Sequence, residues 1–258
     1  MSRTKKHAAL IIAMIMAFTV IPGAIMVDTA SADTKLSKPK LTNHAASSTS
    51  IKNTWKKVKD AKGYEVYRAT KEKGKFKKVK TIKSGKTVSW ANKKLKKNKN
   101  YFYKVRAYQT INGKKEYSKF SNVEWAVPTN APNWEYSMSS KKKTTNKFKL
   151  QITNKSRYKM AFTKDGAVFK DENALYAMES LTPEQLTNID ELAAIGSYKA
   201  IAAKKTVKPG KTVTLTYKTS RKVSYSSKSL VSGEFKYNKK AYALYAGWDF
   251  GSFCERIQ

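Results

Sequence analysis

The side chains that most often carry nucleophilic or metal chemistry are scarce in this sequence. It holds two histidines, His7 and His44, and a single cysteine, Cys254. A Ser-His-Asp or Cys-His arrangement needs an imidazole held by a third group inside a scaffold. His44 instead stands in a Ser-, Thr-, Asn- and Ala-rich stretch that reads as a leader. Zinc sites built from His and Cys are excluded by number, and no Gly-rich phosphate loop occurs. We therefore expect a protein that is not an enzyme and that uses no cofactor or metal.

Carboxylates leave one catalytic alternative open. A glycosidase needs only a pair of acidic residues, so the second half of the chain could hold a carbohydrate-active enzyme or its accessory module. Seven of the eleven acidic residues in that half lie between Asp165 and Glu191. Asp165, Asp171 and Glu172 lack the close alternation of a calcium loop, which favours a solvated acidic face over a metal site.

The charge of the chain indicates a different class of partner. Lys and Arg number 53 against 18 acidic residues, a net charge of +35, and only six of the 53 are Arg. Lysines attract polyanions as point charges, without the planar bidentate recognition that Arg gives. The candidates are an anionic cell-envelope polymer, acidic polysaccharide, lipid headgroups and, non-specifically, nucleic acid. The alternative is that the lysines only keep strand faces soluble and protect sheet edges from aggregation.

Candidate binding residues occur at two places in the sequence. Five lysines crowd one short segment before Tyr101 and form the densest positive spot of the first half: Lys93, Lys94, Lys96, Lys97 and Lys99. An aromatic platform for stacking on sugars or bases is expected at Trp248, within Gly247-Trp248-Asp249. Cys254 follows Phe253 in an aromatic tail, so we expect its thiol to be buried.

The N-terminus predicts export. Arg3, Lys5 and Lys6 precede an apolar run over residues 8–27, and Ala30-Ser31-Ala32 offers small residues for a signal peptidase. Retention as a membrane anchor is the alternative, because the run approaches the ~20 residues that span a bilayer. Pro22-Gly23 breaks the helix and favours cleavage. We expect residues 1–32 to be a signal peptide and the mature chain to begin at Asp33, secreted or associated with the cell wall.

Apolar and aromatic residues recur at set intervals between positions 55 and 107. Trp55 precedes Gly63-Tyr64-Glu65-Val66-Tyr67-Arg68, Leu95 stands six positions before Tyr101, and Tyr103, Val105 and Ala107 follow at period two. Over residues 38–128 this pattern resembles a fibronectin type III module, here in a secreted bacterial protein. The resemblance implies a β-sandwich in which the Tyr101 hydroxyl bonds back to the connection before its own strand. It assigns structural roles to Trp55, Tyr64, Val66, Leu95, Tyr101 and Val105, whereas this fold by itself names no ligand.

Alternation and turn residues place the expected strands of this module. They cover 39–41, 51–57, 63–69, 76–82, 87–90, 101–110 and 117–125. Asn112-Gly113 should form a type I′ turn. In the strand from Tyr101, Phe102, Lys104, Arg106 and Tyr108 should face away from the core. Pro128 and Pro132 then flank a short, stiff linker over residues 129–133.

The second half, residues 134–258, is read from pattern alone. Apolar alternation at 148–152, at 213–217 and on both sides of Asn238-Lys239-Lys240 predicts a second, immunoglobulin-like β-sandwich. Thr182-Pro183-Glu184-Gln185 carries an N-cap and a Pro at the first helical position, which predicts a helix over residues 183–195. The expected fold class is thus all-β, with two tandem β-sandwiches and a short helical insertion.

These features favour an exported binding or adhesion protein, retained at an anionic cell-envelope or matrix polymer through distributed lysines. Besides the carboxylate enzyme, a third hypothesis is a module that binds another extracellular protein through the helix near 182–195. Salt separates them, because polycation binding weakens steeply with ionic strength while a hydrophobic or catalytic pocket responds little.

Overall fold

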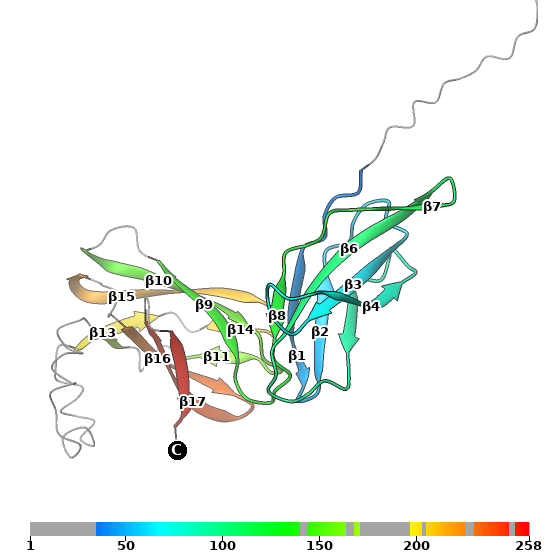
Figure 1. Ribbon diagram of the computed structural model, residues 1–258. Coiled ribbons are helices and arrows are strands. Elements are labelled where there is room, and N and C mark those ends of the chain that lie inside the picture. The colour runs from blue at the N-terminus through cyan, green and yellow to red at the C-terminus, as the bar shows by residue number, and fades with distance from the viewer. Residues whose placement is uncertain are drawn as a thin grey trace, which may run out of the picture. The chain divides into compact units, whose positions relative to one another are not determined.

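The computed structural model describes residues 35–139, 144–163, 168–170, 197–202, 205–224, 230–247 and 251–257 (Figure 1). The predicted signal peptide at 1–32 and the predicted helix at 183–195 lie outside these residues, as do Asp165, Asp171, Glu172 and Trp248. Within them every regular element is a β-strand. A search of the same residues for a helix able to cross a membrane finds none. The chain is all-β and consists of tandem β-sandwiches, as predicted.

The first sandwich has a three-stranded sheet and a five-stranded sheet. The first contains β1 (Leu41–Ser47), β2 (Ser50–Trp55) and β5 (Ser89–Asn92) in the order β1-β2-β5. The second runs β4 (Lys77–Ile82), β3 (Gly63–Ala69), β6 (Tyr101–Ile111). Along the other edge of β6 lie β7 (Lys114–Tyr117) and β8 (Glu124–Ala126). All neighbouring strands in these two sheets pair antiparallel.

The core of this sandwich follows from period two. Successive side chains of a strand point to opposite faces, and Tyr101, Tyr103, Val105 and Ala107 of β6 are all buried between the sheets. From the facing sheet they meet an apolar set that shares their cluster: Leu41, Ile51 and Trp55. The Trp55 and Tyr64 rings lie 5.2 Å apart between centroids. The other face of β6 therefore presents Phe102, Lys104 and Arg106 outward.

Two predicted strand boundaries were wrong. The first strand does not end at Leu41 but begins there, and it carries His44, which lies in no leader. Asn43 and Ala45 face inward beside Leu41, so β1 pairs with β2 despite its short polar side chains. The expected strand over 117–125 is broken between β7 and β8. In this gap two serine hydroxyls take the place of backbone carbonyls as acceptors for β6. Ser118 Oγ accepts a hydrogen bond from Ala107 N at 2.9 Å, and Ser121 Oγ accepts one from Val105 N at 3.0 Å.

Two tight turns have the backbone that their sequences indicate. Asn112 and Gly113 have φ angles of 49° and 78° between β6 and β7. A type I′ turn requires positive φ at both central residues, so this prediction is confirmed. Asn238 and Lys239 turn with φ of 47° and 66° between β16 (Leu230–Tyr237) and β17 (Lys240–Gly247). The hairpin predicted around residues 238–240 is therefore present.

Among the described residues, the strands of the second sandwich form one continuous sheet of ten strands. Its two parts are joined through β13. One part contains β9 (Trp134–Ser139), β10 (Thr144–Asn154), β15 (Thr212–Ser224) and β13 (Ser197–Ala202). Strand β13 pairs with β12 (Val168–Lys170), which leads into the other part. That part holds β11 (Met160–Phe162), β14 (Lys205–Val207), β16, β17 and β18 (Ser252–Arg256).

Both parts of this sheet enclose one core. Phe148, Leu150 and Ile152 of β10 share an apolar cluster with Phe235 of β16 and Leu244 of β17. The Phe148 and Tyr217 rings stack with centroids 5.2 Å apart. The alternating residues predicted on either side of the turn at 238–240 thus serve packing.

Candidate functional site

The five lysines before Tyr101 lie on the connection between β5 and β6. Lys93, Lys94, Lys96, Lys97 and Lys99 are all exposed. The loop backbone is held at three points: Leu95 N donates to Thr49 O at 2.9 Å, Lys96 N to the Tyr101 hydroxyl at 3.0 Å, and Asn98 N to Pro128 O at 3.0 Å. With Leu95 buried beneath, the lysines project outward from a fixed loop. None of the five forms an ion pair among the described residues.

A buried carboxylate that the sequence did not single out lies on the outward face of β3. Glu65 is 0% exposed and receives hydrogen bonds from four side chains. Arg106 donates from Nε at 3.1 Å and from Nη2 at 2.8 Å, and Lys78 Nζ donates at 3.0 Å. The hydroxyls of Tyr67, at 3.0 Å, and Tyr117, at 3.4 Å, complete the set. Burial alone would raise the pKa of Glu65, but the bonds from Arg106, Lys78 and Tyr67 outweigh it and lower this pKa to about 2.

Around this carboxylate, cations and rings alternate over β3, β6 and β7. The Lys104 ammonium lies 4.6 Å from the centre of the Phe76 ring and 4.2 Å from that of Phe120. The Arg106 guanidinium lies 3.7 Å from the Tyr117 ring centre, 5.2 Å from Phe120 and 5.3 Å from Tyr67. Cations over ring faces are attracted by the ring quadrupole. We call the six residues the cation–aromatic strip: Tyr67, Phe76, Lys104, Arg106, Tyr117 and Phe120.

The cation–aromatic strip keeps donors available for an anion. Arg106 uses Nε and Nη2 within the protein, and among the described residues Nη1 has no hydrogen-bond partner. Its side chain is 24% exposed. Lys104 Nζ likewise has ring neighbours but no carboxylate partner among the described residues. Because the rings and Glu65 hold these cations in place, an incoming anion would have little side-chain freedom left to remove.

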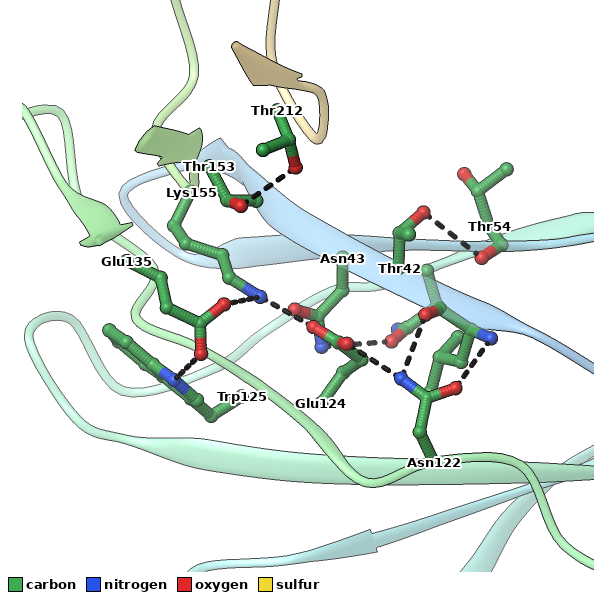
Figure 2. A network of polar contacts seen from close by, with 12 residues as sticks. Thr42, Asn43, Thr54, Asn122, Glu124, Trp125, Glu135, Thr153, Lys155 and Thr212 are labelled. Carbon is green, nitrogen blue, oxygen red and sulfur yellow. Dashed lines mark hydrogen bonds and ion pairs between the residues drawn. The ribbon is translucent and has the colours of Figure 1, made fainter. Parts of the chain in front are cut away.

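A second polar cluster lies where β1, β8, β9 and the end of β10 meet, within the compact unit formed by residues 35–258 (Figure 2). The Lys155 side chain is 1% exposed, and its Nζ lies 2.5 Å from Glu124 Oε2 and 3.4 Å from Glu135 Oε2. The Lys155 backbone also takes part, since its carbonyl accepts from Ala45 N at 2.8 Å and its N–H donates to Asn133 O at 2.9 Å. A buried ammonium needs such partners, so this cluster fixes the local backbone.

His44 takes part in packing beside the same cluster. Its Nδ1 lies 2.9 Å from Ala45 O, and its ring packs against Gly210. Burial lowers the pKa of His44, and the charges of Lys52 and Lys155 act in the same direction, against the hydrogen bond to Ala45 O, which raises it. A search of the described residues finds no group of three or more His, Cys, Asp or Glu able to hold a metal.

Part of the cation–aromatic strip was within reach of sequence reasoning. Period two already turned Lys104 and Arg106 outward from β6. The rings that cover them come from outside that strand: Phe76 precedes β4 and Phe120 lies between β7 and β8. No spacing rule joins such distant positions, and Glu65 looked like any outward residue of a strand.

Comparison with known proteins gives matches among solved structures. No family model matches the sequence, and no curated protein matches it. A Fn3-like protein from Clostridium thermocellum is 24% identical, with a TM-score of 0.30, over 38% of this chain and 94% of that one. A myokine structure is 21% identical, with a TM-score of 0.29, over 34% of this chain and 93% of the other. The FN1-FN3 domains of chicken CNTN1 are 11% identical, with a TM-score of 0.30, over 86% and 69% of the two chains.

Proposed function

We propose that this protein is a non-enzymatic binding protein that is retained at an anionic cell-envelope polymer or acidic polysaccharide through its lysines. The observation that carries the proposal is the excess of basic over acidic residues, 53 against 18. With so few carboxylates the lysines outnumber their possible partners, and such a surface attracts polyanions.

The two positive surfaces of the first sandwich have complementary roles in this proposal. The lysine loop at 93–99 offers five exposed ammonium groups on a fixed backbone and supplies attraction without strong geometric preference. The cation–aromatic strip offers a guanidinium held by Glu65 and rings on which a sugar face can rest. A polymer that carries both sugars and anionic groups would use both surfaces, whereas DNA or a simple polyanion would use chiefly the loop.

The salt dependence of binding tests this function. Affinity of the purified protein for lipoteichoic acid, alginate and DNA should fall linearly with salt on logarithmic axes, with a slope set by the number of contacts. Binding that persists unchanged at ~1 M salt, where the Debye length is about 3 Å, would refute the electrostatic mechanism. Such a result would favour the alternatives in which the second half of the chain is an enzyme or binds another protein.

Charge reversal tests the contribution of the loop. We expect replacement of its five lysines by Glu to weaken binding to all three polymers and to reduce the salt slope. The matched control reverses five other exposed lysines of the same sandwich, with the same change in net charge: Lys52, Lys56, Lys57, Lys59 and Lys62. Equal losses in both variants would show that binding is spread over the surface and would remove the loop from its special role.

A further inference from the structure

A cleft of about 600 Å³ opens on the outward face of β6 and β8. Two aromatic residues, Phe102 and Trp125, line it and are register partners across the two strands. Directly opposed residues of antiparallel strands have their side chains within ~5.5 Å of each other at Cβ. Both side chains are half-buried and both line the cleft, so we call these two residues its aromatic wall.

The Trp125 ring is held by the polar cluster of Figure 2. Its Nε1 donates to Glu135 Oε1 at 3.2 Å, and the other oxygen of Glu135 lies 3.4 Å from the buried Lys155 Nζ. The same ammonium lies 5.7 Å from the Trp125 ring centre. The paired Glu135 and Lys155 thus both contact the indole and fix it before any ligand arrives. A wall that needs no rearrangement lowers the cost of ordering on binding.

The remaining lining consists of two valines, Val123 and Val127, and four polar residues, and it contains no basic residue. Asn100 and Asn133 contribute amides, and Glu72 and Glu135 contribute carboxylates. About one residue in five of the chain is Lys or Arg, so a lining of eight residues without one sets this cleft apart from the surface around it. Its charge repels the anions that the lysine loop attracts. Carboxylate and amide oxygens accept hydrogen bonds, and the amide nitrogens donate them.

We propose that this cleft is a binding subsite for an uncharged sugar ring of a glycan. The apolar face of the sugar rests on the aromatic wall of Phe102 and Trp125. Its hydroxyls donate to Glu72 and Glu135 and exchange hydrogen bonds with Asn100 and Asn133. A small number of directed polar groups around an aromatic wall is the usual composition of a site for a small ligand. The proposal does not depend on polyanion binding, since it concerns other residues and a neutral ligand.

Titration of the full chain with neutral oligosaccharides tests the subsite. The probes are tetramers of N-acetylglucosamine and of glucose at millimolar concentrations, followed by tryptophan fluorescence and by calorimetry. Affinity should be the same at ~0.15 M and ~1 M salt, because no ion pair to the ligand is formed. Trp125→Ala and Asn100→Ala should each weaken binding about tenfold, equivalent to ~1.4 kcal/mol.

Neighbouring variants separate this proposal from the proposed function. Lys99→Ala, next to Asn100 but on the lysine loop, should leave sugar binding unchanged. Trp125→Phe keeps an apolar ring and should retain more affinity than Trp125→Ala, with folding checked by the unfolding transition. Absence of binding by both tetramers would overturn the subsite while leaving polyanion binding intact. Binding of tetramethylammonium or a lysine peptide in their place, lost in Glu72→Gln, would also overturn it and assign the cleft to a cation.

Discussion

Replacement of Glu65 by Gln tests whether the buried carboxylate organises the outward face of the first sandwich. The substitution keeps the size of the side chain and removes its charge. Arg106 and Lys78 then lose their common counter-ion, and one of the two oxygens that received four donors becomes an amide nitrogen. Side chains that donate to Glu65 then face the amide nitrogen, which is itself a donor, in a site with no exposure to water. Unsatisfied buried groups of this kind are costly.

The size of the effect follows from the pKa of Glu65. A fall from an ordinary 4.5 to about 2 corresponds to ~3 kcal/mol at about 1.4 kcal/mol per unit. Because this pKa is lower in the folded state, its stabilisation is complete above about pH 4.5 and is lost as the pH falls towards 2. At pH 7 we expect Glu65→Gln to destabilise the first sandwich by ~3 kcal/mol, lowering its Tm by ~10–20 °C.

The assay is denaturant unfolding at pH 7 and at several values down to pH 2, followed by tryptophan fluorescence, to which Trp55, Trp90 and Trp125 of the first sandwich supply three of the five indoles. The difference between wild type and Glu65→Gln should shrink steadily below pH 4.5. The matched control is Glu116→Gln on β7, where the side chain is exposed and a change within ~0.5 kcal/mol is expected. Equal stabilities of Glu65→Gln and wild type at pH 7, or a difference that does not vary with pH, would refute the reasoning.

Three further experiments test other parts of the structure. Tyr101→Phe removes the hydroxyl that accepts a hydrogen bond from Lys96 N at 3.0 Å and should destabilise the first sandwich by ~1 kcal/mol. An unchanged urea midpoint would show that this bond does not stabilise the sandwich. Glu124→Gln should destabilise more than Glu135→Gln in the same assay, because Glu124 lies closer to the buried Lys155 ammonium and is 18% rather than 49% exposed; the reverse order would contradict the geometry. The Cys254 thiol is half-buried and not fully buried as expected. This partial burial, with the charge of Glu255, raises the pKa of Cys254 to about 11, so iodoacetamide at pH 8 should react more slowly with the native than with the unfolded chain, and equal rates would contradict the raised pKa.

The strands of the first sandwich could be predicted because their signals are local: period-two alternation in β6 and the turn at Asn112 and Gly113 each act within a few residues. The sandwich architecture and the roles of Leu95 and Tyr101 followed from the resemblance over residues 38–128. The errors came from residues whose state depends on distant partners. The polar composition of β1 is typical of a leader. Its pairing with β2 depends on the partner strand, so its own residues do not predict it. The strand ends at Tyr117 because serine hydroxyls bond to β6 beyond it. Strand propensity does not report such bonds, so the predicted strand was too long.

The binding surfaces illustrate the same limit in another form. A cluster of lysines is visible in sequence because its members are neighbours, and the loop at 93–99 is exposed as its composition indicates. The cation–aromatic strip joins Phe76, Lys104 and Phe120 from three separate segments. The cleft joins Glu72, Phe102 and Trp125 across more than fifty positions. Counting aromatics drew attention to Trp248, whereas the lining of the cleft comes from Trp125, which strand register places opposite Phe102.

The two proposed surfaces lie in line on one strand, and this constrains the ligand that could use both. Phe102, Lys104 and Arg106 occupy successive outward positions of β6, and at ~3.4 Å per residue each step is ~7 Å. Phe102 belongs to the uncharged end and Arg106 to the cationic end. A polymer lying along β6 would therefore place a neutral sugar in the cleft and an anionic group on Lys104 or Arg106 one or two steps away. A uniformly charged chain such as DNA cannot satisfy both ends, because Glu72 and Glu135 repel it from the cleft. If both proposals hold, the preferred ligand is a glycan in which charged and uncharged units alternate over a short repeat.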